Sequence, residues 1–297
     1  MPPNLLHENC SSSIINLIQR DVNPTILPQI NFNSVEKECI NILMPHLSPD
    51  QVDASDLEGY DAIVFFSHWQ QQMYNLFLDI PYSSGIVMKN AIDPMPLVEK
   101  PRKGIGLLYV GDMDKGLDTV LSSFNRLTKR KYTEARLAVC ARPIAGRDGK
   151  TMIKELTSNP RVKWYESVDE ELLNGLYNQS HIFVYPTNYP EVSYTPLIKA
   201  MSSGCMCIHS SYGSLPETAL DMTAMYGYHE DKMQHTVHFT HELNNALNIY
   251  NHSGLRRSMM QTLRDQKKIV DNIYDWKKRS YQWNELLMNF IIKKDRK

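Results

Sequence analysis

The stretch of chain over residues 185–217 holds the side chains best suited to chemistry. It follows an apolar run typical of a buried strand, and its loop carries one carboxylate, Glu191. Pro196 and Gly204 mark the start and the end of a short helix. Backbone N–H groups at a helix start bind anions, and parallel α/β sheets bind such ligands where their strands end. We therefore expect residues 192–195 to form a phosphate-binding loop beside Glu191.

A second loop, Gly111–Leu117, also follows an apolar strand and opens a helix. Gly111 lets the backbone approach a ligand closely, and the charge of Lys115 can neutralise a phosphate. The spacing is not that of a P-loop, which requires G-x-x-x-x-G-K-S/T. The loop is therefore either part of an anion site or a tight turn with a solvated lysine.

The segment 181–217 resembles the donor-binding part of the retaining GT-B glycosyltransferases of family 4, also called glycosyl transferases group 1. The family pattern contains a spaced pair of glutamates, then Ala-Met and a glycine, and later Gly-Gly-x-x-Glu. The positions of this chain that match it are Glu191, Ala200, Met201, Gly204, Gly213 and Glu217. Lys199 stands in place of the second glutamate of the pair. The resemblance covers about residues 60–220 and is weak over the first 55 residues.

The resemblance implies roles for these positions. Glu191 would lie against the transferred sugar and stabilise the oxocarbenium-like charge that develops there. The loop after Gly111 resembles the family's G-R-L-x-x-x-K-G loop, with Asp112 where an arginine is expected. The residues expected to bind a nucleotide-sugar donor are Gly111, Lys115, Val192, Ser193, Tyr194, Thr195, Lys199 and Glu217. Two acids also have simpler explanations, because Glu191 can cap a helix and Glu217 is an ordinary first-turn acid.

Lys199 is the main departure from the family pattern. The family glutamate accepts hydrogen bonds from the ribose hydroxyls, which a lysine cannot do. Three explanations compete: Lys199 pairs with Glu191 or with the phosphates, the donor is held differently, or donor binding is weakened or lost.

His68 is the second catalytic candidate. It follows the apolar run 62–67, which places it at the carboxyl end of a strand in the first domain, facing the expected interdomain cleft. There it could orient the acceptor or donate a hydrogen bond to the sugar, although a lone histidine also fits a structural role. No histidine spacing is completed by Cys or carboxylate into a metal set. We therefore expect no metal and no cofactor, as is typical of GT-B enzymes.

The length and charge of the chain favour two domains. The 297 residues can bury two cores, and residues 1–95 hold three Lys and Arg against eleven Asp and Glu. The remainder holds 29 against 22, and this basic half suits a diphosphate ligand. We predict an N-terminal acceptor-side domain over 1–95, a donor-binding domain over 96–275, and a final helix over 276–297 that crosses back to the first domain.

Alternating strands and helices predict an α/β protein with two Rossmann-like, doubly wound parallel sheets and a shortened first domain. In the first domain we expect helices over 13–20, 35–47 and 68–78 and strands over 25–32, 62–67 and 85–90. In the second we expect strands over 104–112, 135–141, 161–168, 181–186 and 205–210. Helices are expected to begin at Leu117, at Asp169 and near Pro196, with another helix start at residues 213–217.

Composition excludes several classes of protein. No apolar run is long enough to cross a membrane, no secretory signal is visible, and no block of Lys and Arg with aromatics suggests nucleic-acid binding. The five cysteines contain no C-x-x-C pair, so we expect reduced core thiols and a cytoplasmic protein.

These observations predict a glycosyltransferase that moves a sugar from a nucleotide-sugar to a glycan, protein or small-molecule acceptor. Retention of configuration is implied by the resemblance alone. Two alternatives stay open: a catalytically impaired GT-B-like protein that binds nucleotides or glycans, which Asp112 and Lys199 motivate, and a sugar-nucleotide epimerase of the same fold.

Overall fold

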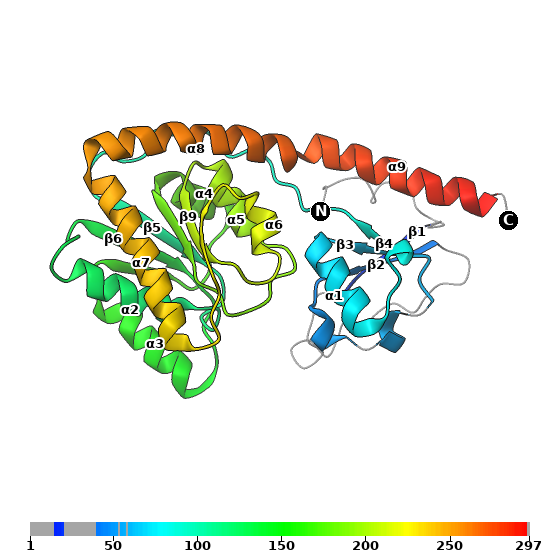
Figure 1. The fold of residues 1–297 in the computed structure, drawn as a ribbon, viewed down its shortest axis with the longest axis horizontal. Coiled ribbons are helices and arrows are strands. Elements are labelled where there is room, and N and C mark those ends of the chain that lie inside the picture. Colours follow the sequence, from blue (N-terminus) through cyan, green and yellow to red (C-terminus); the bar gives the residue numbers. More distant parts are fainter. Residues whose placement is uncertain (1–14, 21–39, 53, 58, 296–297) are drawn as a thin grey trace. The chain divides into compact units, whose positions relative to one another are not determined.

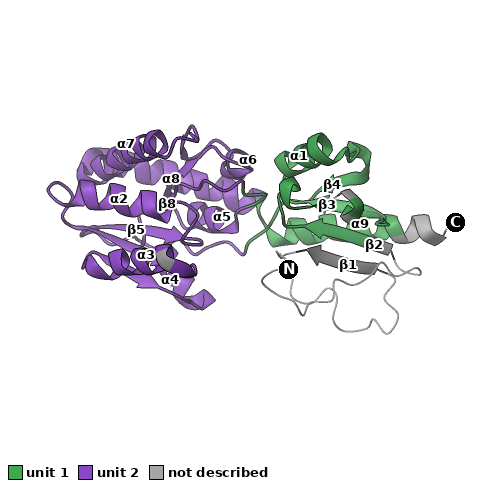
Figure 2. Cartoon of the chain, turned by 90° about the horizontal axis from the view of Figure 1, so that it is seen from below, with its two compact units in different colours: residues 1–92, 191–193, 274–297 green, residues 93–190, 194–273 purple. Residues whose placement is uncertain are grey.

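The computed structural model describes residues 15–20, 40–52, 54–57 and 59–295. Contacts divide the chain into two compact units (Figure 2). Unit 1 comprises residues 1–92, 191–193 and 274–297, and unit 2 comprises residues 93–190 and 194–273. The short segment 191–193 therefore belongs by its contacts to unit 1, although unit 2 surrounds it in the sequence.

Unit 1 is built on a parallel sheet of four strands in the order β1-β2-β3-β4 (Figure 1). The strands are β1 (Ile15–Arg20), β2 (Ile40–Pro45), β3 (Ala62–Phe65) and β4 (Gly85–Val87). The helices are α1 (His68–Leu78), α9 (Trp276–Asp295) and the short 3-10 turns η1 (Pro49–Gln51), η2 (Ala54–Leu57) and η3 (Tyr82–Ser84).

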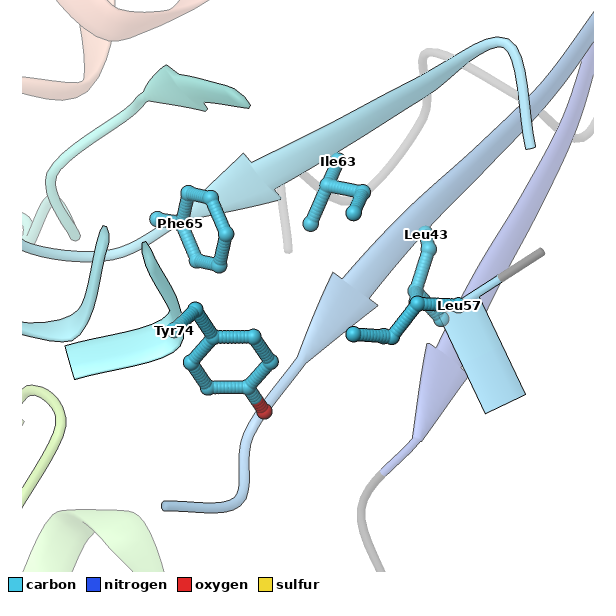
Figure 3. Close-up of a cluster of buried hydrophobic side chains, with 5 residues drawn as sticks. All are labelled: Leu43, Leu57, Ile63, Phe65 and Tyr74. Carbon is cyan, nitrogen blue, oxygen red and sulfur yellow. The ribbon is translucent and has the colours of Figure 1, made fainter. Parts of the chain in front are cut away.

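Alternating side chains of β2 and β3 fill a core on each face of this sheet, because successive strand residues point to opposite sides. On one face, Leu43, Ile63 and Phe65 pack with Leu57 and with Tyr74 of α1 (Figure 3). The cluster on the other face consists of Ile42, Met44, Val64, Phe66 and Met88, covered by Trp283, Leu286, Leu287 and Phe290 of α9. Strands β2 and β3 are thus covered on both faces.

Two helix predictions for unit 1 were wrong. Residues 15–20 and 40–45 form β1 and β2 instead of helices. Both segments are short and contain β-branched isoleucine, and periodicity alone cannot separate a strand from a helix over so few residues. The strand predicted over 25–32 lies outside the described residues. The predictions for β3, α1 and β4 are confirmed.

Unit 2 contains a parallel sheet of six strands in the order β10-β9-β8-β5-β6-β7. The strands are β5 (Ile105–Val110), β6 (Ala135–Cys140), β7 (Val162–Tyr165), β8 (Ile182–Tyr185), β9 (Met206–Ser210) and β10 (Ala224–Tyr226). The helices are α2 (Leu117–Thr128), α3 (Gly146–Ser158), α4 (Glu170–Gln179), α5 (Thr195–Ser202), α6 (Leu215–Ala219), α7 (Lys232–Asn251) and α8 (Ser253–Ile273). The α/β class with two parallel, Rossmann-like sheets is confirmed.

The helices of unit 2 bury the faces that their sequences indicate. Leu117, Val120, Leu121 and Phe124 of α2 are fully buried, which matches the helical spacing of apolar residues. Helix α2 packs beside α3 and α7, and α8 packs beside α7 and α5 (Figure 1). Sequence reasoning did not identify α3, α7, α8 or β10.

Two buried histidines of unit 2 are held neutral. His181 accepts the N–H of Gly106 at Nδ1 (3.0 Å) and donates from Nε2 to the carbonyl oxygen of Pro101 (2.9 Å). His209 donates from Nδ1 to the carbonyl of Ser210 (2.9 Å), and its Nε2 lies 2.7 Å from the Thr223 hydroxyl. Burial lowers the pKa of each histidine to about 4. A proton on Nδ1 of His181 would also oppose the N–H of Gly106.

Unit 2 should lose stability as the pH falls below about 6.5, the ordinary pKa of histidine. Because both folded pKa values lie lower, the unfolded chain binds protons first, and the loss continues down to about pH 4. Each histidine contributes roughly 1.4 kcal/mol per pH unit within that window. Urea unfolding between about pH 7 and about pH 5 measures the slope. His209→Asn should make it shallower, and a flat profile in the wild type would contradict the prediction.

Candidate functional site

The order of strands in unit 2 creates a crevice at one edge of its sheet. From β5 the chain adds β6 and β7 on one side, and then crosses to add β8, β9 and β10 on the other. Strands β5 and β8 are neighbours, so the direction of the chain reverses between them. Open parallel sheets bind their ligands at the carboxyl ends of the strands at such a reversal. The loops after β5 and β8, at residues 111–116 and 186–194, flank this point.

A cavity of 350 Å³ lies at the carboxyl ends of β5, β6, β7 and β8. Residues from the loop after each of the first three strands line it, together with aromatic side chains. The lining includes Gly111, Asp112, Lys115, Arg142, Tyr165 and Tyr194. Since all of these residues belong to unit 2, the cavity is complete within that unit.

The loop after β5 requires glycine at position 116. Gly116 has a φ of +89°, and a Cβ there would lie 2.0 Å from the carbonyl oxygen of Pro186. The hydroxyl of Tyr109 holds the same loop from inside, 2.7 Å from the carbonyl oxygen of Asp112 and 3.1 Å from that of Lys115. The Lys115 ammonium lies 4.2 Å from the centre of the Tyr189 ring, on the loop after β8. The two loops that flank the reversal are therefore in contact.

Asp112, at the position where the family has arginine, forms an ion pair. The Arg142 guanidinium meets Asp112 Oδ1 through Nε at 3.0 Å and through a terminal nitrogen at 2.9 Å. Arg142 follows β6, the neighbour of β5, so the pair joins the ends of adjacent strands. Both side chains line the cavity.

Glu191 and the two residues after it are held by unit 1. The Ser67 hydroxyl donates to the carbonyl oxygen of Val192 (2.7 Å), and Asn90 donates to the Ser193 hydroxyl (2.8 Å). Glu191 is only 7% exposed. His68 is exposed at the first position of α1, directly after Ser67. His68 follows Ser67 in the sequence and Glu191 precedes Val192, so both catalytic candidates lie next to this hydrogen bond.

The residues after this segment return to unit 2. The Tyr194 ring stacks on Tyr185 with their centres 3.9 Å apart, and its hydroxyl hydrogen-bonds to the carbonyl oxygen of Val110. Thr195 begins α5, with Pro196 in its first turn as predicted. The expected donor-binding residues Gly111, Lys115 and Tyr194 thus share the cavity, whereas Val192 and Ser193 contact unit 1.

Lys199 forms an ion pair with Glu170, the first residue of α4. The two atoms Nζ and Oε1 lie 2.9 Å apart; the lysine side chain is 19% exposed and the glutamate side chain 77%. The hydrogen bond and the charge of Lys199 lower the pKa of the Glu170 carboxyl. The partner of Lys199 in this ion pair is therefore Glu170 and not Glu191, which was one of the partners expected from the sequence.

Glu217 lies in the first turn of α6, the helix after β9, and is partly exposed. Its predicted contact with a donor stays a prediction. Sequence reasoning missed Arg142 and Glu170, the two ion-pair partners. A signal for Arg142 was present, because it directly follows an apolar strand as Asp112 does.

Neither a metal cluster nor a membrane span is seen in the part of the chain that the structure describes. No three His, Cys, Asp or Glu side chains there gather as metal ligands, and no helix there combines the length and apolarity needed to cross a bilayer. Cys140, Cys205 and Cys207 are buried free thiols. The predictions that no metal is required and that the protein is cytoplasmic stay predictions.

Comparison with solved structures defines the class of the fold. Sucrose-phosphate synthase from Thermosynechococcus elongatus has a TM-score of 0.69 at 16% identity, covering 90% of this chain and 70% of that one. A glycosyltransferase from Rickettsia africae has a TM-score of 0.68 at 14% identity, covering 86% and 72%. HepE from Anabaena, in complex with UDP and glucose, has a TM-score of 0.67 at 13% identity, covering 84% and 72%. The fold is therefore that of the GT-B glycosyltransferases.

The sequence itself shows the family. A family model described as Glycosyl transferases group 1 matches residues 104–252, half of the chain. The chain belongs to this family of glycosyltransferases, as the motifs over 181–217 predicted. No curated protein sequence matches the chain.

Proposed function

We propose that this glycosyltransferase moves a sugar from a nucleotide-sugar donor, bound by unit 2, to an acceptor bound by unit 1. The observation that carries the proposal is the 350 Å³ cavity at the carboxyl ends of β5 to β8, lined by Lys115 and Arg142. A crevice at a chain reversal with two cations suits a nucleoside diphosphate. The similar HepE structures contain UDP and UDP-glucose, and a similar starch synthase IV from Arabidopsis thaliana contains ADP.

In this proposal Lys115 neutralises the donor phosphates and the amides of residues 192–195 hydrogen-bond to them. Glu191 stabilises the positive charge that develops on the sugar as the bond to the phosphate breaks. His68 orients the acceptor or donates a hydrogen bond to the sugar. Retention of configuration and independence of metal rest on the resemblance to retaining GT-B enzymes.

A binding protein without turnover is the second candidate. The two positions that depart from the family pattern, Asp112 and Lys199, are both engaged in ion pairs. If these pairs do not open toward a donor, the cavity would bind a nucleotide without the contacts that drive transfer. This observation favours testing binding and turnover separately.

The test uses UDP-glucose, UDP-N-acetylglucosamine, ADP-glucose and GDP-mannose. Calorimetry measures binding, and release of nucleoside diphosphate with and without an acceptor panel measures turnover. Binding with release supports the transferase, and binding without release under every acceptor supports the second candidate. Binding of none of the donors or their nucleoside diphosphates would contradict both.

Exchanging Lys199 for glutamate should have opposite effects depending on Glu170. Lys199→Glu alone puts a second carboxylate where the ion pair now spans 2.9 Å, so repulsion should weaken binding of the donor nucleotide. Lys199→Glu with Glu170→Gln removes the repulsion and offers an acceptor for ribose hydroxyls. A hydrogen bond to a charged group stabilises by more than 1 kcal/mol, so this double variant should bind about fivefold more tightly than wild type.

Calorimetric titration with the best nucleoside diphosphate checks this prediction. The control is Lys129→Glu, an equal charge change at an exposed residue that follows α2. Weaker binding by the double variant would show that Lys199 itself contacts the donor.

A further inference from the structure

We propose that Arg142, oriented by Asp112, supplies the guanidinium that binds the diphosphate of the donor in this chain. The inference rests on the proposed function and assigns a residue that determines how the donor is held. Its basis is the ion pair between Arg142 and Asp112, together with the finding that both residues line the cavity.

The ion pair holds a positive charge from the loop after β6 at the end of the neighbouring strand β5. Arg142 belongs to the loop after β6, but its contacts of 2.9 and 3.0 Å with Asp112 Oδ1 bring the guanidinium to the end of β5. Lys115 lies three residues beyond Asp112 in the same loop. Arg142 therefore reaches the loop that also presents Lys115, beside the reversal between β5 and β8.

The guanidinium keeps donors for a ligand after it has met Asp112. An arginine carries five N–H donors in a planar fork. Asp112 engages Nε and one terminal nitrogen, and the Arg142 side chain is 80% exposed. The remaining N–H groups can bind two phosphate oxygens in the bidentate way typical of arginine.

Asp112 orients Arg142, and it also makes Arg142 necessary for binding a diphosphate. The charged side chains that line the cavity are Lys115, Arg142, Asp112 and Glu166. A diphosphate approaching the loop after β5 would meet the Asp112 carboxylate, whose repulsion only Arg142 neutralises through a direct ion pair in the described part of the chain. Loss of Arg142 would thus remove a phosphate ligand and also expose a repelling charge. Loss of both residues should be less harmful than loss of Arg142 alone.

The experiment compares UDP, ADP and GDP with their monophosphates and nucleosides by calorimetry, using the series that binds wild type most tightly. Arg142→Ala should weaken diphosphate binding by about 10- to 100-fold and leave nucleoside binding within about twofold, because a charged hydrogen bond to phosphate is lost. Arg142→Ala with Asp112→Asn should recover part of the loss. The reciprocal exchange Asp112→Arg with Arg142→Asp should keep most of the diphosphate affinity.

Each other outcome overturns the inference. Equal losses for diphosphate and nucleoside would show that Arg142 reads the nucleoside or only supports the fold, and circular dichroism of each variant separates these cases. Unchanged diphosphate binding by Arg142→Ala would remove Arg142 from the site while leaving the proposed function intact. Failure of wild type to bind any of the nucleotides would instead overturn the proposed function together with this inference.

Discussion

Replacing Glu191 with glutamine should lower turnover by about 100-fold or more and leave nucleotide affinity within about twofold, because only the reacting sugar needs the charge. The substitution keeps the size of the side chain, which is 7% exposed. In the proposed mechanism this substitution removes the negative charge beside the sugar, so the developing positive charge of the transition state is no longer stabilised. A group that acts only in the transition state lowers kcat without weakening binding of the nucleotide.

The measurement is release of nucleoside diphosphate under saturating donor, with calorimetric Kd for the nucleotide alone. Glu99→Gln is the matched control, because Glu99 is exposed and its ion pair with Arg102 is a surface pair of little energetic value. If Glu191→Gln turns over like the control, Glu191 does not act on the reacting sugar. An equal fall in affinity and turnover would assign Glu191 to the structure of its loop.

Replacing Gly116 with alanine should destabilise unit 2 by about 3 kcal/mol or more and abolish nucleotide binding, because backbone strain and a steric clash arise at the same position. The residue has a φ of +89°, which a side chain adopts with strain. The new Cβ would also meet the Pro186 carbonyl oxygen at 2.0 Å and its carbon at 2.7 Å. Relief requires the loops after β5 and β8 to separate, and these loops flank the proposed phosphate site.

The variant Gly146→Ala separates the backbone strain from the steric clash. Gly146 has the same φ of +89°, but a Cβ there meets nothing within 4 Å. Its replacement should therefore cost only about 1 kcal/mol, the strain of the left-handed backbone. Urea unfolding of both variants gives the comparison. Equal losses of stability would show that the contact with Pro186 relaxes freely and that the loops after β5 and β8 are not held together by their close approach.

Local patterns explain why most of unit 2 was predictable. The strands β5, β6, β8 and β9 are short and mostly apolar, and α2 has apolar residues at helical spacing. The same reasoning was wrong for β1 and β2, where a short segment with a few apolar residues suits either a helix or a strand. Pairing with neighbouring strands decided these cases, and pairing is a long-range interaction.

Part of the cavity lining could be predicted in the same way. The positions of Gly111, Lys115 and Tyr194 follow from strand ends and the helix start, and the structure brings them to one cavity. The partners of Asp112 and Lys199 could not be predicted. Arg142 lies 30 residues from Asp112, and Glu170 lies 29 residues from Lys199, so only the order of strands makes them neighbours.

The sequence by itself determined the family, the strand–loop–helix units and the residue types available for chemistry, because hydrophobic spacing, helix starts and glycines act within a few residues. Only the tertiary structure decided which charges meet. It placed Glu191 in a buried segment held by Ser67 and Asn90 of unit 1, and it gave Lys199 a carboxylate partner on α4. The physical reason is that an ion pair or a hydrogen bond between loops depends on the order in which parallel strands assemble, which no local pattern contains.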